Sequence, residues 1–172
     1  REPQDPWLWK PGCPETHNGW LDLRVFDRMA VAQGAGVGGG SLIYANVSVE
    51  APASAFAKGW PKEIDYAELR PHYDRVKETM NVRPVPANQW NPRMRLMQDA
   101  AKAIGKPERF RQIDLAVTFD DALTLDPAHP PEYSASRTVV NRQGVEQGTC
   151  VHVGQCDIGC PVDAKNTLDL NY

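Results

Sequence analysis

The sequence predicts an α+β fold, and three observations point to it. Apolar residues recur at helical spacing over residues 66–80 and again over residues 92–104. Short runs rich in β-branched and aromatic residues, typical of strands, cover residues 24–33, 113–119 and 137–141. Prolines and glycines interrupt the chain so often that the regular elements are expected to be short.

The two helical stretches carry recognisable ends. Asp65 is a candidate N-cap for the first helix, and Pro71 is expected to kink or restart that helix. Asn91 and Pro92 open the second helix as its cap and first residue, and Gly105 is expected to close it. These signals make the two helices the best-defined elements of the sequence.

Length, charge and composition exclude several classes of protein. A chain of 172 residues suits one domain that buries a core without needing disulfides or metal. The formal net charge is −3 with both signs mixed, so neither nucleic acid nor an anionic membrane surface is an expected partner. The apolar stretches are too short to span a membrane, and residues 1–6 lack the pattern of a signal peptide. The sequence leaves the oligomeric state and the compartment open, with the cytoplasm slightly favoured.

The most informative stretch is the glycine-rich run of residues 34–41. Five glycines in seven positions leave backbone N–H groups open to close approach by a negatively charged or flat ligand. The run contains Gly-x-Gly-x-x-Gly at Gly34, Gly36 and Gly39, the pattern of a dinucleotide-binding turn. The continuation after Ser41 is β-branched and soon broken by proline, which disfavours the helix of an ordinary dinucleotide-binding fold. A glycine-rich turn that binds nothing is the alternative.

Three of the four cysteines lie within eleven residues. Cys150, Cys156 and Cys160 follow the spacing of a bacterial ferredoxin motif, including the proline after the last cysteine. Val153 occupies the second ligand position, and Cys13 is the remaining candidate for a fourth ligand to iron–sulfur or zinc. Thiols that simply pack, or a local disulfide, are the alternative.

Taken together, the two stretches resemble the glucose-methanol-choline (GMC) oxidoreductases, in particular the bacterial branch of cholesterol oxidase-like and choline dehydrogenase-like enzymes. The resemblance rests on the glycine run with its continuation Ser-Leu-Ile-Tyr-Ala-Asn-Val over residues 41–47. It rests also on residues 148–167, from Gly-Thr-Cys to Ala-Lys-Asn-Thr. The two motifs occur in the family's order and at about its separation, so the resemblance covers most of the chain.

The resemblance implies an FAD-dependent enzyme that oxidises a small-molecule alcohol by hydride transfer to flavin N5. Ile43 and Tyr44 stand where some members attach the flavin through a histidine, so FAD is expected to be bound non-covalently. The family often has Asn-Gly where this chain has Tyr44-Ala45, and Asn46, one position later, is either a flavin contact or a loop asparagine. No catalytic or metal-binding residue is carried over, and the implied cofactor-binding residues are Gly36, Val37, Gly38, Gly39, Gly40, Ser41 and Asn46.

The resemblance also implies how the chain is organised. Residues 1–59 would form an N-terminal loop region, a strand and the flavin-contacting segment. Residues 60–145 would form helices and strands of a substrate-binding domain. Residues 146–172 would hold the cysteine loop and the start of a helix, capped by Asp163, that returns to the FAD domain.

The chain is expected to be an internal piece of a longer enzyme and inactive alone. It does not begin with methionine, and the family's N-terminal glycine fingerprint and C-terminal catalytic histidine have no match in it. Two other functions stay open. One is an iron–sulfur or zinc module at the cysteine cluster. The other is a non-catalytic interaction domain that docks through its tryptophans, Trp7, Trp9, Trp20, Trp60 and Trp90.

Overall fold

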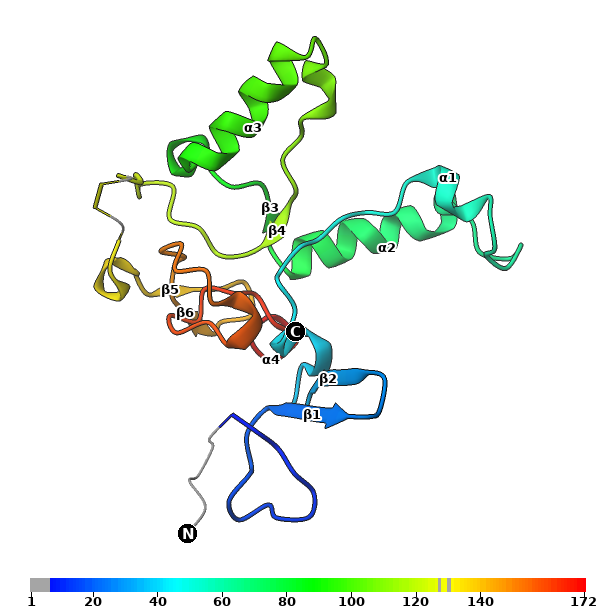
Figure 1. The fold of residues 1–172 in the computed structure, drawn as a ribbon, viewed down its shortest axis with the longest axis vertical. Helices are drawn as coiled ribbons and strands as arrows, with labels where there is room; N and C mark the ends of the chain where they lie inside the picture. The colour runs from blue at the N-terminus through cyan, green and yellow to red at the C-terminus, as the bar shows by residue number, and fades with distance from the viewer. Residues whose placement is uncertain (1–6, 127, 130) are drawn as a thin grey trace.

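The elements are short and mostly local, as a computed structural model of the chain shows for residues 7–126, 128–129 and 131–172 (Figure 1). The strands are β1 (Leu21–Val25), β2 (Ala30–Gly34), β3 (Val82–Arg83), β4 (Leu115–Ala116), β5 (Val139–Val140) and β6 (Glu146–Gln147). The α-helices are α1 (Ala53–Phe56), α2 (Tyr66–Thr79), α3 (Pro92–Ala103) and α4 (Leu168–Asn171). Single 3₁₀ turns are η1 (Gly39–Leu42), η2 (Ala87–Gln89), η3 (Pro107–Arg109), η4 (Tyr133–Ala135) and η5 (Cys156–Ile158). This mixture of helix and strand agrees with the predicted α+β class.

The stretch at residues 24–33, predicted as one strand, is instead most of an antiparallel hairpin. β1 pairs with β2 from Leu21 opposite Gly34 to Val25 opposite Ala30. The chain turns back because the polar pair Asp27-Arg28 separates the two apolar runs. The single-strand prediction was therefore wrong, but β2 does lead into the glycine-rich run as expected.

Helix α2 begins where the sequence predicts, and helix α3 both begins and ends where it predicts. The Asp65 carboxylate accepts a hydrogen bond from Glu68 N at 2.8 Å, and Asn91 caps α3 through Met94 N at 2.9 Å. Gly105 follows α3 in the left-handed region with φ +69°. The expected break at Pro71 is absent, because α2 runs through Pro71 to Thr79. Pro71 removes one backbone hydrogen bond early in a helix of 14 residues, and the remaining bonds hold the helix together.

The last helix does not begin where the sequence predicts. The N-cap position of α4 is occupied by Thr167, and Leu168 is the first residue of the helix. Asp163 instead lies in a turn with φ +50°. The prediction that Asp163 caps this helix was wrong. Residues 164–167 between them run extended instead, with Lys165 bridged to Val117.

A small ladder at the centre of the molecule joins distant segments. β3 pairs antiparallel with β4, and β4 is extended by bridges from Val47 to Leu115 and from Val117 to Lys165. The predicted strands at 113–119 and 137–141 are therefore found only in part, as β4 and β5. The buried apolar side chains gather around this ladder and are few: Met80, Ala116, Val117, Phe119, Val151 and Ala164.

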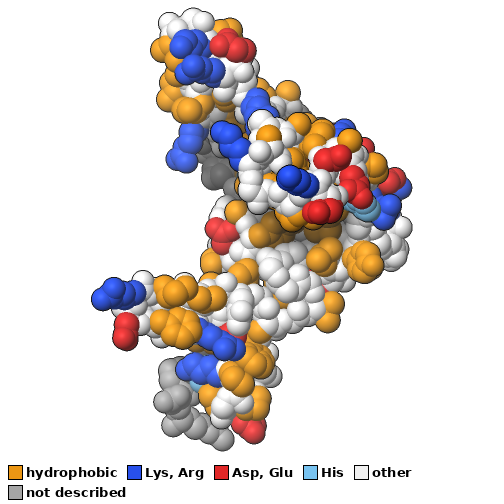
Figure 2. All heavy atoms as spheres, turned by 90° about the vertical axis from the view of Figure 1, so that its right-hand side faces the viewer, with side chains coloured by type: hydrophobic (Ala, Val, Ile, Leu, Met, Phe, Trp, Pro, Cys, Tyr) orange, Lys and Arg blue, Asp and Glu red, His pale blue; other side chains and the backbone are white. Residues whose placement is uncertain are grey.

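The molecule exposes far more surface than a compact domain of its size. Its accessible area is 11938 Å², against about 8,400 Å² for a compact monomer of this mass. α2 and α3 project from the centre as separate arms (Figure 1), and apolar side chains lie at the surface of the arms (Figure 2). Leu96, Met97 and Ile104 on or beside α3 are more than half exposed. The expectation of one domain with a substantial core does not hold for this chain by itself.

The five tryptophans differ in exposure, whereas the interaction-domain hypothesis requires all of them to be available to a partner. Trp7 and Trp60 are about half exposed, whereas Trp9, Trp20 and Trp90 are partly buried. Trp60 also packs on Phe56 with the ring centres 4.8 Å apart.

Among the helices of the described residues, none is long and apolar enough to cross a bilayer. The prediction for residues 1–6 lies outside the described residues.

Candidate functional site

The glycine-rich run forms a tight turn between β2 and η1. A side chain on Gly34 would place its first carbon 1.9 Å from the carbonyl oxygen of Gly39, so only glycine fits there. Gly38 has φ +97°, and its carbonyl accepts a hydrogen bond from Ser41 Oγ at 2.8 Å. The run therefore leads from a strand into a single 3₁₀ turn, in agreement with the prediction against an ordinary dinucleotide-binding helix.

One face of this turn is open and carries almost no side chains. No atom lies within 4 Å of the position that a first side-chain carbon would take on Gly39 or Gly40. Gly36 and Val37 beside them are exposed, Val37 by 81%. Gly40 has no left-handed φ, so nothing in the described residues requires glycine at that position. A flat or anionic ligand that approaches the backbone from outside would require it.

The opposite face of the turn is held by the end of the chain. Ser41 Oγ accepts a hydrogen bond at 2.9 Å from Leu168 N, the first residue of α4, across 127 positions of sequence. A side chain on Gly38 would begin 3.2 Å from Asp169 Oδ1, so glycine there allows α4 to pack closely. The glycine-rich run and the motif at residues 148–167, recognised separately in the sequence, thus meet in space.

Lys165 fixes the segment that follows the turn. Its ammonium donates to the carbonyl oxygens of Leu42 at 2.7 Å, Tyr44 at 3.4 Å and Cys156 at 2.7 Å. The residue is only 3% exposed, and burial lowers the pKa of its ammonium. Among the described residues, no carboxylate lies within ion-pair distance of it. Lys165 is therefore a buried cation whose partners are all neutral: the three carbonyl groups and the Tyr44 ring, whose centre lies 5.4 Å from the ammonium.

Asn166 connects the same segment to the centre of the molecule. It is fully buried, and its backbone carbonyl accepts a hydrogen bond from the Tyr44 hydroxyl at 2.5 Å. Its side chain accepts from Thr118 Oγ1 at 2.9 Å and donates to the Met80 carbonyl at 2.8 Å. Burial raises the pKa of Tyr44 to about 12. Sequence reasoning assigned no role to Tyr44, Lys165 or Asn166, although the Ala-Lys-Asn-Thr motif contains the last two.

Asn46, a predicted cofactor contact, is buried on the inner side of this segment. It is 3% exposed with φ +54°, and its carbonyl accepts from Ala116 N at 2.9 Å. Burial and the neighbouring Cys160 raise the pKa of Cys156, and a hydrogen bond from the Asn46 side chain to the Cys156 sulfur opposes this rise. The structure gives Asn46 a packing role, and its contact with a cofactor stays a prediction.

The cysteines are free and partly buried. Burial raises the pKa of Cys150 to about 11, with further contributions from Cys156 and Cys160, which lie near it. Cys13 instead contacts His17, its sulfur 3.5 Å from Nδ1. Within the described ranges, no group of three or more histidine, cysteine or acidic side chains could hold a metal ion.

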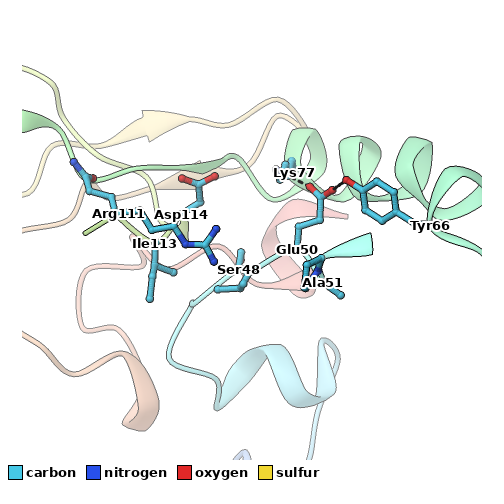
Figure 3. A pocket seen from close by; sticks show the side chains of 11 residues that line it. Ser48, Glu50, Ala51, Tyr66, Lys77, Arg111, Ile113 and Asp114 are labelled. Atoms are coloured by element: carbon cyan, nitrogen blue, oxygen red, sulfur yellow. Dashed lines mark hydrogen bonds and ion pairs between the residues drawn. The ribbon is translucent and has the colours of Figure 1, made fainter. Parts of the chain in front are cut away.

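A polar cavity of about 350 Å³ lies beside the segment that leaves the glycine-rich run (Figure 3). Glu50 is the centre of its charge network: Figure 3 shows its carboxylate facing the Tyr66 hydroxyl, which donates to it. Lys77 donates to the same carboxylate at 3.1 Å. The Tyr66 bond, followed by that from Lys77, lowers the pKa of Glu50. Glu50 is consequently a weaker base than an ordinary carboxylate.

His152 makes the stability of the cysteine loop depend on pH. Its Nε2 lies 2.8 Å from Gln89 Oε1, its ring stacks on Phe119, and burial lowers its pKa below the ordinary 6.5. The unfolded chain therefore takes up a proton at a higher pH than the folded chain. We expect stability to fall as the pH is lowered through about 6.5 and below. Urea unfolding between pH 7.5 and 5 measures this slope.

The His152→Gln variant tests the origin of that slope. It should lose much of the pH dependence, whereas His72→Gln on the exposed surface of α2 should retain it. Equal slopes for the two variants would contradict the assignment to His152.

Comparison with known proteins places the chain in a family of flavin-dependent enzymes. The profile described as GMC oxidoreductase matches residues 19–118, more than half of the chain, so the chain belongs to the GMC oxidoreductases. The resemblance seen in the sequence is thereby confirmed.

The similar curated proteins are cholesterol oxidases. The one from Acinetobacter baumannii is 29% identical over 169 residues, covering 96% of this chain and 29% of that protein. The one from Mycobacterium tuberculosis is 30% identical over 171 residues, covering 96% of this chain and 28% of that protein. The chain thus spans less than a third of the length of these relatives. No solved structure matches it.

Proposed function

We propose that this chain is the flavin-contacting and adjoining portion of an FAD-dependent oxidoreductase that oxidises an alcohol by hydride transfer to flavin N5. The observation that supports it most is the open face at Gly39 and Gly40, where the left-handed φ of +51° accounts for glycine at position 39 but neither a neighbouring atom nor a left-handed φ accounts for it at position 40. Membership of the GMC family and the cholesterol oxidase names of the relatives agree with it.

The chain's own residues would hold the cofactor through backbone groups. Residues 36–41 present the open face to the flavin and the diphosphate, while Ser41 and Lys165 hold the turn against α4 and η5 from behind. FAD supplies the hydride acceptor. Its attachment would be non-covalent, and one observation on the segment after the turn agrees with this: the Tyr44 hydroxyl is bonded to the Asn166 carbonyl and has a pKa of about 12, so it stays protonated and is a poor nucleophile.

The proposed division into a flavin-contacting part, residues 1–59 with 146–172, and a substrate part, residues 60–145, agrees with the path of the chain. The flavin-contacting parts pack on each other through η1 and α4. Residues 60–145 carry the projecting helices α2 and α3 (Figure 1). Their exposed apolar side chains are available for packing against the remainder of the enzyme or against its substrate.

The Gly40→Ala variant of the full-length enzyme tests the proposal. A methyl group on the open face would keep the flavin from the backbone, so we expect FAD to bind about tenfold more weakly, a loss of about 1.4 kcal/mol. The folded protein has space for the methyl group, and its thermal unfolding without FAD should not change. Flavin fluorescence on titration with FAD gives the dissociation constant.

Gly12→Ala is the matched control, since Gly12 also has open space around it but lies in the N-terminal loop. Its affinity for FAD should equal that of the unmodified enzyme. An unmodified enzyme that binds no FAD, or a Gly40→Ala variant with unchanged affinity, would contradict the proposal.

A further inference from the structure

Lys165 is an unusual residue to find behind the glycine-rich turn. A buried ammonium without a carboxylate partner is costly, and an apolar side chain of similar length would fill the same space. The three carbonyl groups that Lys165 contacts supply partial negative charge but no compensating net charge. Such a charge calls for an explanation in terms of function.

We propose that Lys165 is an electrostatic residue of the flavin site, whose buried positive charge favours the reduced, more negative form of the cofactor. This inference rests on the proposed function. Hydride transfer adds negative charge to the flavin, and a fixed cation in a water-poor environment stabilises that charge at no cost of reorganisation.

The hydrogen bonds of Lys165 fix where its charge lies. Two of its three acceptors, the carbonyls of Leu42 and Tyr44, belong to the segment that continues the glycine-rich turn. The third, that of Cys156, lies in the cysteine loop. All three N–H groups are used, so Lys165 does not itself bind a ligand, and its charge acts through the turn in front of it.

The surroundings leave this charge largely uncompensated. After burial, the ionisable groups that act most on the pKa of Lys165 are Cys156 and Cys160, and burial raises the pKa of Cys156, which keeps its thiol neutral at pH 7. Asp157 and Asp169 act on it from exposed positions, where water screens their charge. Neither lies within ion-pair distance in the described structure.

The test is the flavin midpoint potential of the full-length, FAD-loaded enzyme. Lys165→Met removes the charge but keeps the length of the side chain. We expect the ratio of affinities for reduced and oxidised FAD to fall about tenfold, which for a two-electron couple is a shift of about 30 mV to more negative potential. Redox titration against a dye of known potential measures it.

Tyr44→Phe separates electrostatics from packing. It removes the bond to Asn166 and loosens the same segment without changing any charge. A loosened segment alone would shift the potential in both variants, whereas the proposed charge effect predicts a shift only for Lys165→Met. Equal potentials for Lys165→Met and the unmodified enzyme would overturn the proposal.

Asp157→Asn supplies a variant that should fold, because Asp157 is exposed. It removes a negative charge that opposes Lys165 and that water screens only in part, so the potential should become more positive, by less than the shift expected for Lys165→Met. Asp99→Asn, on the distant and exposed surface of α3, is its control and should have no effect. If Lys165→Met does not fold, an unchanged potential in Asp157→Asn overturns the proposal. An unmodified enzyme that takes up no FAD would instead refute the proposed function.

Discussion

Replacing Gly34 by alanine is expected to destabilise the glycine-rich turn by about 3 kcal/mol or more. The new side-chain carbon would lie 1.9 Å from the Gly39 carbonyl oxygen. This carbon is fixed to the backbone of residue 34 and the oxygen belongs to the backbone of Gly39, so neither atom can rotate away. Gly34 is also fixed on its other side, where it pairs with Leu21 at the end of the hairpin. The clash therefore cannot be relieved without breaking the hairpin or the turn.

Urea unfolding of the full-length enzyme measures this loss, and Gly40→Ala in the same turn is the control. Gly40 has open space, so its alanine variant should keep the stability of the unmodified protein. The contrast between two glycines six positions apart separates a glycine that the fold requires from one for which a ligand contact is proposed. Equal stability of the Gly34→Ala and Gly40→Ala variants would show that the turn is not packed as described.

Replacing Asn166 by leucine is expected to cost about 4 kcal/mol, because three buried or half-buried groups would each lose a hydrogen bond to its side chain. The Met80 carbonyl, the Thr118 hydroxyl and the Gln147 amide all bond the Asn166 side chain, at 2.8, 2.9 and 3.3 Å. Leucine has nearly the same size but offers neither donor nor acceptor. The segment carrying Tyr44 should loosen with it, since the Tyr44 hydroxyl bonds the Asn166 carbonyl.

Asn88→Leu is the matched control for this prediction. Asn88 donates two hydrogen bonds to backbone carbonyls, but it is exposed, so water can replace them. We expect its loss of stability to stay below about 1 kcal/mol. The two urea midpoints compare a buried amide with an exposed one, and similar midpoints would contradict the central role of Asn166.

Local signals in the sequence predicted the helices well. Asp65, Asn91 and Gly105 act within one helical turn of their own position, so their roles could be assigned without tertiary information. The glycine-rich turn was equally local, because its open face follows from glycines that are adjacent in sequence. Pro71 was misjudged because the strength of the surrounding helix, rather than proline alone, decides whether a helix breaks.

The contacts behind the turn could not be predicted because they are not local. Lys165 meets Leu42, and Asn166 meets Tyr44, across more than a hundred positions, and no short pattern encodes such pairing. The prediction for Asp163 failed for a related reason. Asp163 is a suitable capping residue, but Lys165 pairs with the distant Val117, so the chain is not helical directly after Asp163. The single-strand prediction at residues 24–33 failed because the register of a hairpin depends on its turn as much as on its apolar residues.

The bond between Ser41 and Leu168 has a consequence for biosynthesis. A nascent polypeptide leaving the ribosome exposes the glycines long before α4 is made. During translation of the residues between them, the turn therefore lacks the hydrogen bond and packing that α4 supplies. Under the proposed function, capture of FAD by the turn would wait until the residues around Lys165 have emerged. Ribosome-bound intermediates that end before this point would then remain colourless.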